Sequence, residues 1–355
     1  MNARFKRLFL KLAISVVTTL LCCGLAELAL RLISPVQTFV NPLSSFHRFD
    51  AELGWLGVPH RAAKFRKPDF DVMIRTDANG FRKRESAVQP RPGSPVIAVF
   101  GDSFVWGWGI EGGKVFTDVI QNELGPAADV RNFGVDAYGT FQELLLLKHC
   151  LTNHLRPQHV LVMFYENDYG DNTGNDTRRP WLAVDGTNVT IRNYPVARKD
   201  SGAWKKFVKA SYFLSAIAYQ FDFAKEKRRV TSLAQKTFAD NSIAADAQTA
   251  EAFCLDQLRQ VCDREKIQLK FVYVPAFQDV RAAGPTQTRV VLKSLCDQAG
   301  VPLLDLTDDF RKASGTRPGA LFFAHDGHWN TDGHALAGKL VADDFKRGMP
   351  AANAP

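Results

Sequence analysis

Five short apolar runs that alternate with helical patterns constrain the fold of this chain more than any other feature of its sequence. The first run is Val96 to Phe100, an apolar segment with β-branched residues, as in strands that are buried on both faces. Strands that alternate with helices predict a parallel sheet covered by helices on both faces. The other predicted strands are Val130 to Phe133, Val160 to Phe164, Leu269 to Val274 and Pro302 to Leu306, and the predicted helices are Val115 to Leu124, Phe141 to Leu155, Ala245 to Glu265, Thr288 to Gln298 and Gly333 to Phe345.

The N-terminus carries a membrane signal. Four basic residues in the first eleven positions precede an uncharged run from Leu12 to Ala26. That run is shorter than the roughly 20 residues that span a bilayer, but apolar residues extend it to 8–33, and Glu27 and Arg31 fall near an interface. The basic flank predicts a cytoplasmic N-terminus. We therefore expect a single-pass protein of the inner membrane with a periplasmic, extracytoplasmic body. A signal peptide cleaved before Glu27 and a lipidated Cys23 are the alternatives.

The sequence predicts three parts. Residues 1–34 are expected to form a cytoplasmic tail and membrane anchor. Residues 35–95 are rich in Gly, Pro and aromatic residues and contain the turn dipeptide Asn79-Gly80, which predicts an irregular or β-rich appendage and a linker. Residues 96–350 are expected to form the α/β domain.

An insertion at about 171–245 interrupts this domain. It is predicted to contain a polar loop from Asn172 to Asn193 and an amphipathic segment from Trp204 to Phe223. A long insertion after a strand is typical of a lid or a substrate-binding element. A plain solvated pair of helices is the alternative.

Composition excludes several classes of protein. The net charge of +8 is spread along the chain and forms no basic stripe, so we expect no nucleic-acid partner. Six cysteines are too few for a disulfide scaffold, and the sequence has no C-x-x-C pair of the kind that binds zinc. The four later cysteines lie in apolar helical patterns and are predicted to be buried free thiols.

Residues that can carry chemistry follow the predicted strands. Ser103 comes directly after the first strand, Gly134 after the second and Asn167 after the third, and Asp326 and His328 precede the last helix. Because the carboxyl ends of parallel strands meet at one edge of a sheet, we expect these residues to lie close together. A serine hydroxyl is a weak nucleophile unless an adjacent base takes its proton. The set therefore combines a nucleophile, two oxyanion donors and a carboxylate–imidazole pair.

These residues resemble the four sequence blocks of the SGNH/GDSL hydrolase superfamily. The blocks are Gly101-Asp102-Ser103-Phe104, Gly134, Asn167-Asp168, and Asp326 with His328, in the order of the family. The resemblance covers the chain from about Val96 to its end. It implies a three-layer α/β/α fold with a flavodoxin-like five-stranded parallel sheet, and ester hydrolysis or acyl transfer through a serine acyl-enzyme without a metal or other cofactor.

The resemblance also implies a role for each residue. Ser103 is the nucleophile, His328 the general base and Asp326 the acid that orients the imidazole. The backbone N–H groups of Ser103 and Gly134 and the side chain of Asn167 form the oxyanion hole. Such donors are each worth about 3–4 kcal/mol of the barrier.

Two departures from the family pattern bear on these roles. The third block has Tyr165 and Glu166 ahead of Asn167, where the family has Gly-x-Asn-Asp. In the last block His325 stands three residues before His328, where the family has its acid, and Asp326 stands two residues before it. That spacing is similar to the alginate O-acetyltransferase-like branch, in which the pair precedes the serine. We favour Asp326 as the partner of His328 because a carboxylate also stabilises the imidazolium.

The expected function is that of an extracytoplasmic serine esterase. It would remove O-acyl groups, acetyl above all, from an envelope or secreted polysaccharide or another ester. An O-acetyltransferase that passes acetyl to a polysaccharide hydroxyl, with a membrane protein as acyl donor, would use the same residues. An inactive polysaccharide-binding or assembly protein is the third alternative. Trp106, Trp108 and Trp329 are expected to be exposed near the site, where they either stack on sugar rings or pack.

Overall fold

The computed structural model describes residues 3–33, 46–198, 202, 207–208, 210–229 and 243–348. The chain separates into two compact units. We call residues 46–198 with 243–348 the body, and the described residues of 3–33 and 202–229 the anchor unit. Each unit is described by itself.

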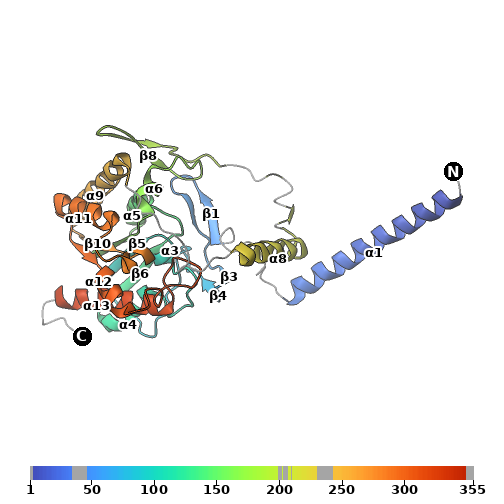
Figure 1. The fold of residues 1–355 in the computed structure, drawn as a ribbon, viewed down its shortest axis with the longest axis horizontal. Coiled ribbons are helices and arrows are strands. Elements are labelled where there is room, and N and C mark those ends of the chain that lie inside the picture. Colours follow the sequence, from blue (N-terminus) through green and yellow to red (C-terminus); the bar gives the residue numbers. More distant parts are fainter. Residues whose placement is uncertain are drawn as a thin grey trace. The chain divides into compact units, whose positions relative to one another are not determined.

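A five-stranded parallel sheet forms the centre of the body (Figure 1). Its strands, in spatial order, are β11 (Leu303–Asp305), β10 (Gln268–Tyr273), β7 (His159–Phe164), β5 (Val96–Gly101) and β6 (Asp129–Gly134). The pairing is parallel throughout, with Gly101 beside Gly134 and Tyr273 beside Phe164. The chain order across the sheet is 2-1-3-4-5, which is the flavodoxin-like topology. The predicted fold class is confirmed.

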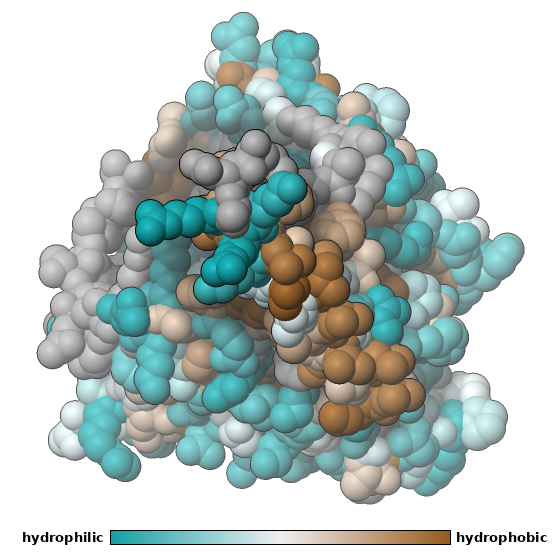
Figure 2. All heavy atoms as spheres, turned by 90° about the vertical axis from the view of Figure 1, so that its right-hand side faces the viewer, coloured by the Kyte–Doolittle hydropathy of each residue, from teal (hydrophilic) through white to brown (hydrophobic). Residues whose placement is uncertain are grey.

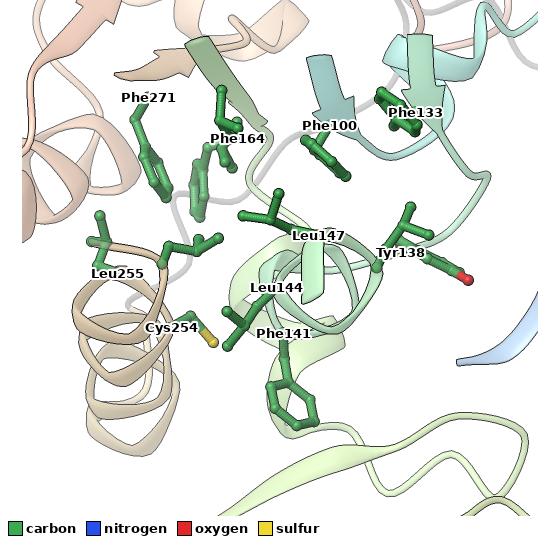
Figure 3. Close-up of a cluster of buried hydrophobic side chains, with 14 of the residues drawn as sticks. Phe100, Phe133, Tyr138, Phe141, Leu144, Leu147, Phe164, Cys254, Leu255 and Phe271 are labelled. Carbon is green, nitrogen blue, oxygen red and sulfur yellow. The ribbon is translucent and has the colours of Figure 1, made fainter. Parts of the chain in front are cut away.

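Alternate residues of the strands enter two separate hydrophobic cores because successive side chains of a strand point to opposite faces. In β5, Ala98 and Phe100 pack with helices α5, α9 and α11, whereas Ile97 and Val99 pack with α4, α12 and α13. Figure 3 shows the first core, where strand phenylalanines face leucines of α5 and Cys254 and Leu255 of α9. The two cores make the body a three-layer α/β/α structure.

The helices of the body follow the predicted periodicity closely. The longest, α9, has the predicted bounds, and the four later cysteines are buried free thiols, as predicted. The short elements α3, α6, α10 and α12 lie outside the predicted set. The bounds are α3 (Ser103–Trp106), α4 (Phe116–Leu124), η1 (Gly125–Ala127), α5 (Thr140–Thr152), α6 (Asp168–Thr173), α9 (Ala245–Glu265), α10 (Phe277–Arg281), α11 (Gln287–Ala299), α12 (Thr307–Ser314) and α13 (Thr331–Gly348).

Three two-stranded antiparallel sheets complete the body. Strands β1 (His47–Asp50) and β2 (Gly54–Gly57), and β3 (Ala62–Lys67) and β4 (Phe70–Arg75), form the β-rich segment ahead of the main sheet. Strands β8 (Trp181–Asp185) and β9 (Asn188–Arg192) form a hairpin where a polar loop was predicted, so that prediction is wrong. The hairpin forms because Leu182 is fully buried and Val184 and Val189 pack against the first core.

The anchor unit consists of helices α1 (Ala3–Ile33) and α8 (Tyr212–Arg229). The segment Arg4–Ile33 has a mean hydropathy of 2.2 in its most apolar window, none of which is buried, and it is long enough to cross a membrane. Its exposed apolar side chains are among those drawn brown in Figure 2. The predicted N-terminal apolar helix is therefore present. Trp204, where the predicted amphipathic segment begins, lies outside the described residues.

Candidate active site

Ser103 lies in a tight turn at the carboxyl end of β5. Asp102 caps the short helix α3, and its Oδ1 accepts a hydrogen bond of 2.9 Å from the backbone N–H of Phe104. Gly101 and Gly107 bracket the turn. A Cβ atom at 101 would come within 2.2 Å of the Val105 side chain, and Gly107 ends α3 with a φ of +82° that favours glycine. The turn therefore presents Ser103 at the edge of the sheet where ligands of such folds bind.

Ser103, His328 and Asp326 form a continuous chain of hydrogen bonds. Ser103 Oγ lies 2.7 Å from His328 Nε2, and His328 Nδ1 contacts Asp326 Oδ1. The backbone N–H of His328 also donates to Asp326 Oδ1, at 3.0 Å. When His328 keeps a proton on Nδ1 and donates it to Asp326, Nε2 has a free lone pair that can accept the serine proton. The structure thus brings together the three residues that the sequence assigned as nucleophile, base and acid.

Asp326 is held in its ionised form. Burial alone would raise its pKa, but the hydrogen bonds and charge of His328 and a hydrogen bond from Trp108 lower the pKa to about 2. The carboxylate is therefore negative at neutral pH. In that form it can stabilise a positive charge on the adjacent His328 imidazole.

Trp108 supports the same two side chains. Its Nε1 donates to Asp326 Oδ2 at 3.1 Å, and its ring is stacked on the His328 imidazole with centroids 4.9 Å apart and planes at 16°. The expectation of exposed tryptophans is wrong for Trp106 and Trp329, whose exposed fractions are 3% and 0%. Trp106 packs against Phe46 and Phe65, and Trp329 belongs to the second core, so neither ring is open to a sugar.

The two other predicted oxyanion donors have partners within the protein. The backbone N–H of Gly134 donates to Asn132 Oδ1 at 2.9 Å, and Asn167 Nδ2 donates to Asp171 Oδ2 at 2.9 Å. A Cβ at position 134 would come within 2.2 Å of the Trp106 backbone nitrogen, so only glycine fits there. Each donor must share or exchange its hydrogen bond to reach an oxyanion. Their oxyanion role, with that of the Ser103 N–H, stays a prediction.

A residue of the β3–β4 hairpin holds the loop that carries Asp326 and His328. Asp69, in the turn of this hairpin, accepts from the backbone N–H of His325 at 3.0 Å and lies 2.5 Å from His325 Nδ1. His325 therefore pairs with Asp69 and is not the partner of His328. Sequence reasoning missed Asp69, because nothing in its neighbourhood marks a contact 256 residues away.

The same hairpin covers Trp108 with aromatic rings. Phe65 of β3 meets the Trp108 ring edge-on with centroids 4.8 Å apart, and Phe70 of β4 does so at 6.5 Å. Lys67 Nζ lies 5.9 Å from the centre of the Trp108 ring. The β3–β4 hairpin therefore positions both the loop that carries His328 and the Trp108 ring that stacks on His328.

Buried carboxyl groups lie behind the site. Glu143, Asp168 and Glu251 are buried, and burial raises the pKa of all three, that of Glu251 to about 8. Among the described residues, no group of three or more His, Cys, Asp or Glu side chains is arranged to hold a metal ion. A cavity of about 670 Å³ lies away from Ser103, at the amino ends of β7 and β10, and none of the triad residues lines it.

The fold and the site together place a Ser-His-Asp arrangement of the serine-hydrolase kind at the carboxyl edge of a flavodoxin-like sheet. Ser103 follows the first strand of that sheet along the chain, and Asp326 and His328 precede the last helix of the body. No protein-family model matches the chain, and no curated protein matches it in sequence.

Solved structures with a similar course of the chain include several ester hydrolases. The lipase/acylhydrolase from Enterococcus faecalis is 16% identical, with 72% of this chain and 97% of that one covered and a TM-score of 0.42. A member of the lipolytic G-D-S-L family from Veillonella parvula is 12% identical, with 72% of this chain and 100% of that one covered and a TM-score of 0.42. A carbohydrate acetylesterase from Sinorhizobium meliloti is 14% identical, with 72% of this chain and 100% of that one covered and a TM-score of 0.38. At these values the matches carry no argument about the activity, which rests on the triad geometry.

Proposed function

We propose that this chain is a membrane-tethered serine esterase that removes O-acyl groups, acetyl above all, from a polysaccharide outside the cytoplasm. The observation that carries the esterase activity is the 2.7 Å contact between Ser103 Oγ and His328 Nε2, with Asp326 behind the imidazole. The tether is supported by α1, which is long and apolar enough to span a bilayer. The polysaccharide follows from that location and from the resemblance to SGNH hydrolases.

The first half of the reaction acylates Ser103. His328 Nε2 takes the hydroxyl proton while Ser103 Oγ attacks the carbonyl carbon of the ester, and the carbonyl electron pair moves to its oxygen. Backbone N–H groups around Ser103 stabilise that negative charge. When the intermediate collapses, the bond to the sugar oxygen breaks and this oxygen receives the proton from His328. The products are the free sugar hydroxyl and an acyl ester on Ser103.

The second half releases the acyl group. A water molecule gives a proton to His328 and attacks the acyl carbon, and the proton then returns to Ser103 as the acid leaves. If a sugar hydroxyl replaces water, the same steps transfer the acyl group instead. Trp108 binds Asp326 and stacks on His328, so its ring serves the triad and offers no argument for sugar stacking.

The test uses the full chain in detergent with p-nitrophenyl acetate and an O-acetylated polysaccharide. We expect acetate release from both substrates, its loss in Ser103→Ala, and labelling of Ser103 by a fluorophosphonate. Ser294→Ala, on the exposed face of α11, is the matched control and should behave as wild type. A folded Ser103→Ala variant that keeps most of its turnover would refute the activity. Acetyl transfer to an added oligosaccharide in preference to water would identify a transferase.

A further inference from the structure

The start of helix α8 is held by a carboxylate of the apolar helix α1. The backbone N–H groups of Tyr212 and Phe213 donate to Glu27 at 3.1 and 2.8 Å, and the Ser211 hydroxyl donates to it at 2.8 Å. The first N–H groups of a helix have no partner within the helix, and a negative charge is favourable there. Glu27 therefore caps α8, although the two segments lie far apart in the sequence.

Arg31 completes this joint between the two helices. Its Nε donates to Glu27 at 2.7 Å, its Nη2 donates to the carbonyl oxygen of Ala210 at 3.0 Å, and its guanidinium lies 4.8 Å from the centre of the Tyr212 ring. Glu27 and Arg31 are the two charges in an otherwise apolar half of α1. Because both are paired and hydrogen-bonded, the cost of placing them near a bilayer is reduced.

An apolar stripe runs from this joint along α8. Phe213 lines one groove with Cys22, Cys23 and Ala26 of α1. Ile217 and Phe221 follow at intervals of four residues, so they share the face of Phe213. Their exposed fractions are 38% and 73%, so the stripe becomes more exposed toward the far end of α8.

We propose that α8 is an interfacial membrane helix, with Ile217 and Phe221 in the bilayer surface. We choose a lipid surface as the partner of this stripe because α8 begins beside Glu27, near the end of α1. In a membrane-spanning helix, that end lies at the surface of the bilayer. In the sequence, the last five residues of α8 are four basic residues and one acidic residue, and the described Lys225, Lys227 and Arg228 complement anionic headgroups. This proposal rests on the membrane tether in the proposed function. It makes this part of the insertion a second membrane attachment instead of a lid.

The test places a photoreactive diazirine amino acid at single positions of the full chain. The protein is reconstituted in phosphatidylcholine vesicles with about one-quarter phosphatidylglycerol. The positions are Ile217 and Phe221 on α8, Val16 on α1 as the reference for membrane insertion, and Val290 as the control. Val290 is an apolar residue of α11 in the body with an exposed fraction of 53%. Lipid adducts on the isolated peptides are quantified by mass spectrometry.

We expect adducts at 217 and 221 to exceed those at 290 by about fivefold or more, because an interfacial helix buries its apolar face among the lipids. If lipid adducts form at position 16 but those at positions 217 and 221 do not exceed the control at 290, this inference is wrong and the tether stands. Absence of adducts at 16 would overturn the tether, and the inference with it. Glu27→Gln should lower the adducts at 217 and 221 and preserve those at 16. Hydrolysis of p-nitrophenyl acetate at the wild-type rate shows that the body of this variant is folded, and the preserved adducts at 16 show that α1 is still inserted.

Discussion

Replacing Trp108 by Phe tests the argument that an indole N–H orients the acid of the triad. Phenylalanine keeps a ring that can stack on His328 and removes the 3.1 Å hydrogen bond to Asp326 Oδ2. Since the pKa of Asp326 is about 2, the lost partner is a charged acceptor at every practical assay pH. Asp326 Oδ1 keeps its contacts with the backbone N–H and Nδ1 of His328, so the acid is loosened but not released.

The magnitude follows from that single lost bond. A hydrogen bond to a charged group is worth about 1.5–3 kcal/mol, and Trp108 is half-buried, so water partly replaces the donor and the low end applies. Because about 1.4 kcal/mol is tenfold in rate, kcat/KM should fall roughly tenfold.

The assay is p-nitrophenyl acetate hydrolysis by the full chain from about pH 5 to about pH 9. Trp181→Phe on strand β8 is the matched control for loss of an indole and should stay near wild type. Equal rates for wild type and Trp108→Phe across this range, with the variant folded, would refute the positioning role of the indole.

The remaining predictions concern the acid, a buried carboxyl and the second strand. Asp326→Asn should lower kcat by about three to four orders of magnitude, because an amide does not stabilise the imidazolium. His325→Ala should cost far less, and equal losses in the two variants, measured with the same ester, would contradict the assignment of Asp326. Burial raises the pKa of Glu251 to about 8, so its contribution to stability is full below its unfolded pKa near 4.5 and declines up to pH 8 by about 1.4 kcal/mol per pH unit. Glu251→Gln should therefore raise the urea midpoint over wild type at about pH 8 and change it little at about pH 5. A rise in the midpoint that is larger at about pH 5 than at about pH 8 would contradict a raised pKa for Glu251. Gly134→Ala should unfold at lower urea than wild type, since its Cβ meets the Trp106 backbone at 2.2 Å, and an unchanged midpoint would contradict that close approach.

The sequence by itself determined the α/β body. Strand and helix periods are local properties of a segment, so the five strands and the long helices were predictable with bounds close to those observed. The carboxyl edge of a parallel sheet is also a local consequence of strand direction. For that reason Ser103 and the pair of Asp326 and His328 were predictable as neighbours, although their roles in catalysis stay predictions.

Only the tertiary structure decided what surrounds these residues. The β8–β9 hairpin forms in a polar stretch because a few buried side chains, such as Leu182, find the core. Asp69 reaches His325, and Trp108 reaches Asp326, across more than two hundred residues. Glu27 caps α8 across a similar separation. Such contacts depend on which surfaces pack together. The hydrophobic period or residue spacing of a single segment does not predict which distant segment it will contact.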